Sequence, residues 1–142
     1  MKKSDEAILN KIIELTNKGQ FKEAIRGLRP LLKKHPASSS ICFVAAKFYY
    51  ESGKYYSSCK YFKKLVLLKS DSEIASLGLY HSLCNLGKEM LALKELKRFI
   101  RINKPVHYKL TILALKKIIK NSTNSKLNEI IIEILLIAKK WG

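Results

Sequence analysis

Apolar residues recur at helical spacing along the chain, in pairs of stretches separated by a glycine. One stretch precedes each glycine and another follows it, with apolar side chains three or four positions apart. The clearest stretches are Cys42, Ala45, Ala46 and Tyr49; Leu79, Tyr80 and Leu83; and Ala24, Leu28, Leu31 and Leu32. This pattern predicts that each unit of the chain is a helix, a turn and a second helix.

The glycines in these turns are regularly spaced. Gly19, Gly53 and Gly87 lie 34 residues apart. A small residue follows each glycine five positions later, as Ala24, Ser58 and Ala92. Glycine can take the left-handed backbone conformation that ends a helix, and a small side chain lets the second helix approach the first closely. We therefore expect three hairpins that share one turn geometry.

This combination of features resembles the tetratricopeptide repeat, a 34-residue helical hairpin with a glycine, an aromatic residue two positions later and a small residue five positions later. The aromatic residue is present as Phe21 and Tyr55, whereas Glu89 replaces it in the third unit. The resemblance implies an all-α solenoid of antiparallel helical hairpins that forms a single domain over residues 1–142.

The resemblance also sets the expected boundaries. It places repeats at about 5–38, 39–72 and 73–106, followed by a C-terminal helical hairpin over 107–142. Pro36 falls where members of the family often end a repeat, and Pro105 ends the third repeat one position later than usual. About eight helices are expected in total, because terminal repeats commonly diverge from the consensus without losing their hairpin form.

The C-terminal hairpin has no glycine in its turn. Its helices are expected over about Tyr108–Ile119 and Lys126–Lys140, with the polar run 121–125 as turn and N-cap. Asn121 lies 34 residues after Gly87 and is the expected left-handed residue, because asparagine tolerates that conformation better than most residues.

The last helix is apolar on nearly every side. Its apolar residues include Ile130, Ile131, Ile132, Ile134, Leu135, Leu136 and Ile137. One interpretation buries this helix between its hairpin partner and the preceding repeat. The other leaves part of it to pack on a second copy of the chain, giving a dimer, or on a partner protein.

In the tetratricopeptide family the first helix of each repeat lines a concave groove that binds a partner. Projected onto this chain, the groove positions are Leu9, Ile13, Phe43, Lys47, Tyr50, Leu77 and His81. We hypothesise that Phe43, Tyr50, Leu77 and His81 form an anchor pocket in it; the alternative is that Phe43 and Tyr50 only pack between helices.

Some members of the family grip a terminal carboxylate with a basic clamp. The corresponding positions here are Leu9, Ile13, Val44, Ile74 and Gly78, so no such clamp is expected. The expected partner is therefore an extended or helical protein segment with apolar anchors and acidic flanks.

The charge of the chain is strongly positive. The sequence has 28 Lys plus Arg against 11 Asp plus Glu, a formal net charge of +17. Either an acidic partner or an AT-rich genome, which favours lysine codons, explains this excess.

Compartment and membrane association are constrained by other features. Three cysteines without a CxxC pair indicate free thiols in a reducing compartment. Polar residues directly after Met1-Lys2-Lys3 disfavour an export signal. The most apolar stretch, 127–138, contains two glutamates and is shorter than the roughly 20 residues that span a membrane. A cytoplasmic protein with no transmembrane segment is expected.

Catalytic motifs are missing from the sequence. The histidines His35, His81 and His107 are isolated from one another, and Cys84 has no histidine at a defined spacing, so surface histidines and a buried thiol are expected. There is no phosphate-binding glycine loop, HExxH or nucleophile elbow. We expect no enzyme activity, cofactor or metal.

Three functions remain open. The first is an adaptor or small cytoplasmic chaperone that holds an apolar segment, similar in architecture to secretion chaperones, although these are often acidic. The second is binding to nucleic acid, because the lysines Lys60, Lys63, Lys64 and Lys69 lie near the tyrosines Tyr55, Tyr56 and Tyr61. The third is immunity to a toxin, which ranks last because nuclease toxins are usually basic.

Overall fold

The computed structural model describes residues 1–104 and 107–141, and these residues form eight α-helices and no strand. The all-α fold expected from the sequence is therefore confirmed. Pro105, the expected end of the third repeat, lies outside the described residues. The chain divides into two compact units, residues 1–69 and 70–142. The solenoid arrangement and the single domain over 1–142 stay predictions.

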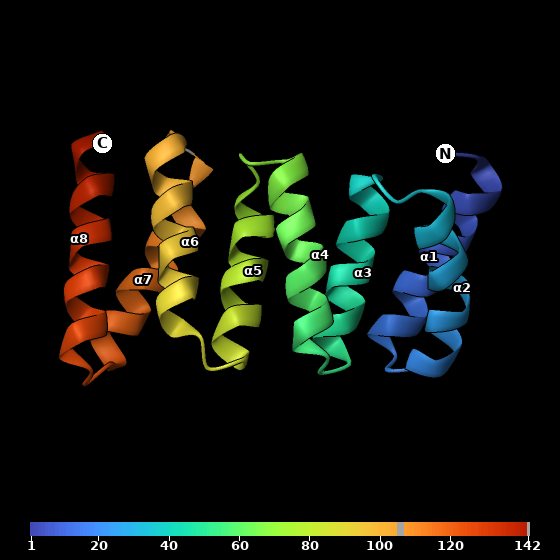
Figure 1. Cartoon of the computed structure of the whole chain (residues 1–142), viewed down its shortest axis with the longest axis horizontal. Helices are drawn as coiled ribbons and strands as arrows, with labels where there is room; N and C mark the ends of the chain where they lie inside the picture. Colours follow the sequence, from blue (N-terminus) through green and yellow to red (C-terminus); the bar gives the residue numbers. More distant parts are fainter. Residues whose placement is uncertain (105–106, 142) are drawn as a thin grey trace. The chain divides into compact units, whose positions relative to one another are not determined.

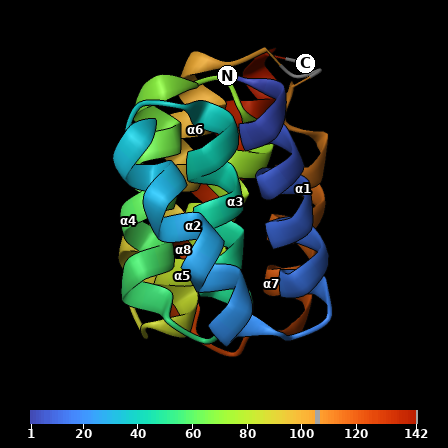
Figure 2. The same ribbon diagram turned by 90° about the vertical axis from the view of Figure 1, so that its right-hand side faces the viewer.

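The first unit consists of two helical hairpins (Figure 1). Its helices are α1 (Lys3–Asn17), α2 (Phe21–Lys34), α3 (Ser39–Glu51) and α4 (Tyr55–Leu68). The α1–α2 pair lies against α3, and α4 packs on α3 to complete the second hairpin. Figure 2 shows α1 and α2 as neighbours, with α3 and α4 behind them. The core between these helices includes Ile12, Leu28, Ile41, Ala45 and Phe48.

The second unit contains the other four helices. They are α5 (Glu73–Asn85), α6 (Glu89–Ile102), α7 (Lys109–Asn121) and α8 (Ser125–Trp141). Helix α6 packs on α5 and on α8, and α7 contacts both α5 and α8. The largest side chains with almost no exposed surface are Phe99, Leu96, Ile100, Leu115, Ile131 and Ile134.

The three glycine turns have the geometry that the sequence predicts. Gly19, Gly53 and Gly87 have φ angles of 73°, 76° and 72°, all left-handed. In the first turn, the amide of Gln20 donates to the carbonyl of Leu15 at 2.9 Å, and the amide of Gly19 donates to Thr16 at 3.0 Å. The same two hydrogen bonds recur in the other turns, so each first helix ends in a Schellman motif.

The small residues after the glycines are fully buried. Ala24, Ser58 and Ala92 each have 0% of their surface exposed, in the first turns of α2, α4 and α6. Serine fits at the second of these positions because its hydroxyl donates within its own helix, to the carbonyl of Tyr55 at 3.0 Å. The complete burial of all three small residues is therefore consistent with the expected close approach of the two helices in each hairpin.

The turn between α7 and α8 differs from the expectation. Asn121 does not take the left-handed conformation, since no described residue other than glycine has a positive φ. Helix α7 includes Asn121, and Ser122 that follows it is extended. Polar side chains organise the turn instead: the side-chain oxygen of Asn124 accepts the amide of Leu127 at 3.1 Å and caps α8.

Helix α7 is capped by a carboxylate from another helix. Glu73, the first residue of α5, accepts hydrogen bonds from the amide and the hydroxyl of Thr111, both at 2.8 Å. Thr111 lies in the first turn of α7 and is fully buried. The negative charge therefore lies at the positive end of the α7 dipole and satisfies two buried donors.

We expect Glu73→Ala to lower the free energy of unfolding by about 1–3 kcal/mol, because it leaves the buried donors of Thr111 without their acceptor. Urea denaturation followed by circular dichroism measures the change. The matched control is Glu129→Ala, an exposed glutamate on α8, which should change stability by less than about 0.5 kcal/mol. Equal effects of the two substitutions would contradict the assignment of Glu73 as a cap.

Candidate functional site

Three of the predicted groove residues lie together in the first unit. Ile13 on α1 and Phe43 and Lys47 on α3 line a small hollow of about 90 Å³, together with Thr16, Asn17 and Val44. Phe43 and Lys47 are one helical turn apart, so they form one wall of the hollow, and Ile13 contributes to the opposite wall. Ile13 and Phe43 keep 38% and 37% of their surfaces exposed, which leaves both available for contact.

Leu9 is placed differently from the other groove positions. It is only 8% exposed and belongs to the core between the helices of the first unit. Leu9 shares its helix face with Ile12 and Thr16, which are also buried. It therefore offers a partner little surface.

Tyr50 is half-buried at the C-terminal end of α3. Its ring packs edge to face on Tyr55, with 5.5 Å between ring centroids and 70° between ring planes. This contact joins the two helices of the second hairpin across their turn. At least part of the role of Tyr50 is thus helix packing, which was the alternative interpretation of this residue.

Leu77 and His81 lie one turn apart on α5, in the second unit. Leu77 is half-buried, and His81 is exposed and contacts the ring of Tyr80 edge to face, with centroids 5.1 Å apart. The part of the imidazole that is covered by neighbouring side chains loses hydration, which lowers the pKa of His81 and favours the neutral ring at pH 7. A pocket that combines these two residues with Phe43 and Tyr50 stays a prediction.

A cluster of charged residues in the first unit was not anticipated. Asp5, at the start of α1, is 5% exposed and accepts hydrogen bonds from Lys34 and His35 at the end of α2. Both donors lie 3.0 Å from the same carboxylate oxygen. His35 is thus a half-buried structural partner and not the isolated surface histidine that the sequence predicts.

The hydrogen bond from His35 and then that from Lys34 hold the pKa of Asp5 below its ordinary value of 3.8. A lowered carboxylate pKa stabilises the folded state above the unfolded-state value, and this contribution disappears as the pH falls through the folded-state value. We therefore expect the melting temperature of Asp5→Asn to lie below that of the parent chain at pH 7, and the gap to narrow below about pH 4.

Thermal melts of both proteins between pH 7 and 2.5 test this expectation. The exposed Asp71 provides a control, since Asp71→Asn should follow the parent chain at every pH. A gap for Asp5→Asn that does not change with pH would contradict the ion-pair assignment.

The cysteines show no features of a reactive site. Cys42 and Cys59 are buried and Cys84 is partly buried. Burial raises the pKa of the Cys42 and Cys84 thiols, so the protonated and poorly nucleophilic form predominates at neutral pH. No group of three or more potential ligands among His, Cys, Asp and Glu is placed to hold a metal ion within the described parts of the chain.

Lysines and tyrosines lie close together on α4. The ammonium of Lys60 is 5.5 Å from the centre of the Tyr61 ring. That ring also stacks on Tyr49, with centroids 5.6 Å apart and planes 9° from parallel. One face of Tyr61 is therefore engaged within the protein, which leaves less of it for stacking on a nucleic-acid base.

Comparisons with known proteins add no relative. No family model matches this chain, and no curated protein shows significant similarity to it. Over residues 1–104 and 107–141, none of the helices combines the length and apolar character needed to cross a membrane.

Proposed function

We propose that this chain is a tetratricopeptide-type adaptor or small chaperone of the cytoplasm, which holds an apolar segment of a partner protein and carries out no catalysis. The observation that carries the proposal is the hollow in the first unit. Ile13, Phe43 and Lys47, which the resemblance to the tetratricopeptide family places in a binding groove, line this one hollow. The reducing compartment is supported by three cysteines that form no disulfide.

The hollow suits an apolar side chain with an acidic neighbour. Ile13, Phe43 and Val44 supply apolar surface, and Lys47 supplies a positive charge at the same place. Exposed apolar side chains next to lysine favour a segment with an apolar anchor flanked by Asp or Glu. The net charge of +17 would attract such a segment during encounter. A secretion chaperone that shields an aggregation-prone segment is one form of this activity.

The double variant Ile13→Ala/Phe43→Ala tests the proposal. Tagged parent and variant chains are used for pull-downs from native lysate in 0.5 M salt with nuclease, and the captured partner is then titrated against both chains. We expect the variant to bind the partner at least about tenfold more weakly, because central apolar contacts dominate most interfaces.

The control for this experiment is Leu67→Ala on α4. Leu67 is 86% exposed and lies outside the hollow, so its truncation should leave the affinity unchanged. Equal affinity of the parent chain and a folded Ile13→Ala/Phe43→Ala variant would refute the proposed surface.

Binding to nucleic acid is the second candidate, favoured by the contact between Lys60 and Tyr61 and by the net positive charge. Titration of a fluorescent single-stranded RNA at several salt concentrations distinguishes it from the adaptor function. Phosphate-driven binding loses affinity with a slope of about −0.7 per phosphate contact in a plot of log K against log salt. Specific binding with a steep slope would support this candidate, whereas partner capture that survives 0.5 M salt and nuclease supports the adaptor.

A further inference from the structure

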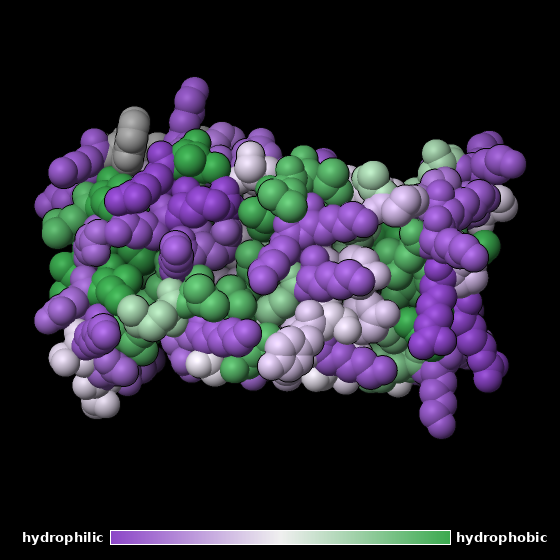
Figure 3. Space-filling model, viewed as in Figure 1, coloured by the Kyte–Doolittle hydropathy of each residue, from purple (hydrophilic) through white to green (hydrophobic). Residues whose placement is uncertain are grey.

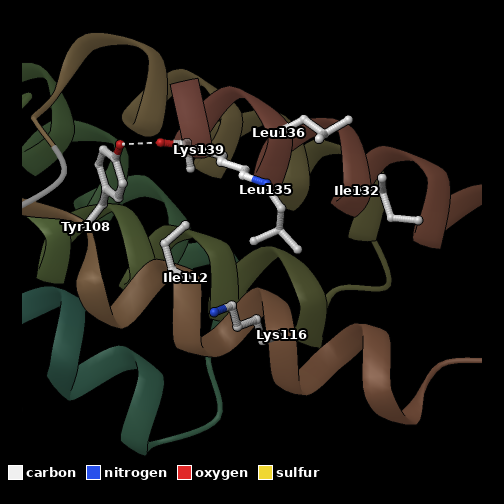
Figure 4. Close-up of a pocket in the computed structure, with 8 residues that line it drawn as sticks. Tyr108, Ile112, Lys116, Ile132, Leu135, Leu136 and Lys139 are labelled. Atoms are coloured by element: carbon white, nitrogen blue, oxygen red, sulfur yellow. Dashed lines mark hydrogen bonds between the residues drawn. The ribbon is translucent and has the colours of Figure 1, made fainter. Parts of the chain in front are cut away.

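A second and larger concave site lies in the other unit, between α7 and α8 (Figure 4). This groove has a volume of about 420 Å³. Its lining residues are Tyr108, Ile112, Lys116, Ile132, Leu135, Leu136, Ala138 and Lys139. Figure 4 shows Ile112 and Leu135 pointing toward each other across the space between the two helices. None of the predicted groove residues belongs to this site.

The groove arises because α8 carries two apolar stripes. One stripe, Ile131, Ile134 and Ala138, is buried in the unit. The other contains Ile132 and Leu136, one turn apart, which remain 47% and 57% exposed. Figure 3 shows uncovered apolar surface among hydrophilic side chains over this part of the unit. The buried stripe agrees with the first interpretation of the Ile-rich helix, and the exposed stripe is the surface that the second interpretation requires.

One end of the groove is fixed by a hydrogen bond within the fold (Figure 4). Tyr108 is 3% exposed, and its hydroxyl donates to the carbonyl of Ala138 at 3.3 Å, which joins the start of α7 to the C-terminal part of α8. Burial raises the pKa of this hydroxyl, so it stays protonated and keeps donating. The groove is therefore a preformed site, which a ligand can enter without first separating the helices.

The dimensions of the groove match a helix. The α7 wall extends from Tyr108 to Lys116, about 12 Å at the rise of an α-helix, or two helical turns. Its residues lie four apart, and the α8 wall includes residues three and four apart on one helix face, such as Ile132, Leu135 and Lys139. Two such rows of side chains form the kind of channel into which the apolar ridge of a third helix packs.

The charges at the rim specify the partner. Lys116 lies on the α7 wall and Lys139 on the α8 wall, and none of the described residues that line the groove is acidic. A second copy of the chain would bring its own lysines against these two, which disfavours self-association. We propose that the groove binds an amphipathic helix of another protein, with acidic residues on both sides of its apolar stripe. This site is separate from the proposed hollow and does not depend on it.

Two synthetic helical peptides test the proposal by fluorescence anisotropy. Both carry leucines at positions i, i+3, i+4 and i+7, flanked by glutamates in one peptide and by lysines in the other. We expect the full chain to bind the glutamate peptide in preference to the lysine peptide. Leu136→Glu should weaken binding of the glutamate peptide at least tenfold, whereas Leu67→Glu, the same change at an exposed site of the other unit, should not.

A charge reversal separates the groove from the general positive charge of the protein. Lys116→Glu/Lys139→Glu should invert the preference in favour of the lysine peptide. The neighbouring pair Lys117→Glu/Lys140→Glu changes the net charge equally at exposed positions outside the groove and should keep the original preference. Binding of the glutamate peptide that Leu136→Glu removes is assigned to this groove, and binding that Ile13→Ala/Phe43→Ala removes is assigned to the hollow, so failure of either site can be recognised independently.

Three outcomes would overturn the proposal. The first is binding of the glutamate peptide that Leu136→Glu does not weaken. The second is equal loss of affinity in the two double-lysine variants. The third is a dimer in sedimentation experiments that Leu136→Glu dissociates, which would assign the groove to a second copy. Circular dichroism of each variant is the control for folding, and we expect every variant to keep the helical spectrum of the parent chain.

Discussion

Phe99→Ala should lower the free energy of unfolding by about 3–5 kcal/mol, the largest effect expected of any single substitution considered. Phe99 lies on α6 and has none of its surface exposed. Helix α6 packs against both α5 and α8. Removal of the ring loses the burial of its apolar surface. It also leaves a cavity that α5, α6 and α8 cannot close by small shifts. Most small domains have only about 5–15 kcal/mol of stability, so the variant should unfold at a much lower urea concentration.

Urea denaturation of the parent chain and three variants measures this effect. Phe99→Leu keeps part of the packing and provides a graded variant if Phe99→Ala is too unstable to purify. Leu113→Ala on α7 is the control, since Leu113 is 63% exposed and its truncation should change stability by less than about 0.5 kcal/mol. A loss below about 1 kcal/mol for Phe99→Ala would contradict the assignment of this ring to the core.

Ala24→Leu should destabilise the first unit by about 1–3 kcal/mol or more, because a larger side chain cannot fit between α1 and α2. Ala24 is fully buried five positions after the glycine that ends the turn. It belongs to the core cluster of this unit, which also contains Leu15, Leu28 and Phe48. Since the interior is close-packed, the added atoms must push the two helices apart or force side chains out of their preferred rotamers.

The repeat pattern makes this a test of more than one position. Ala92 has the same place in α6 and the same complete burial, so Ala92→Leu should be destabilising to a similar degree. Ala7→Leu on α1 makes the same change at an exposed site and should be nearly neutral. Equal melting temperatures for the Ala7 and Ala24 variants would show that the small residue is not required for the hairpin.

The helices and glycine turns could be predicted from the sequence because their causes are local. Left-handed glycines and apolar residues at helical spacing act within one hairpin, and Gly19, Gly53 and Gly87 indeed have the expected backbone conformation. Asn121 was predicted wrongly by the same reasoning. Its turn is formed by the side-chain cap from Asn124, which satisfies the start of α8 without a left-handed residue.

Contacts between distant residues could not be predicted. Asp5 meets His35 across 30 positions, and Glu73 caps Thr111 across 38 positions. A single sequence does not show that these residues meet, because each contact depends on how separate helices pack. The placement of Leu9 had a weak signal: it continues the face of Ile12 and Thr16, and that face turned out to be the buried one.

The most direct measurement of the proposed adaptor function is site-specific photocrosslinking in cells. A photoreactive amino acid at Lys47, in the hollow, is compared with one at Leu67, which is 86% exposed elsewhere in the same unit. We expect Lys47 to crosslink to one protein, through a segment with apolar residues and acidic flanks, and Leu67 not to capture it. Crosslinks to nucleic acid, or to the same set of proteins from both positions, would contradict the proposal.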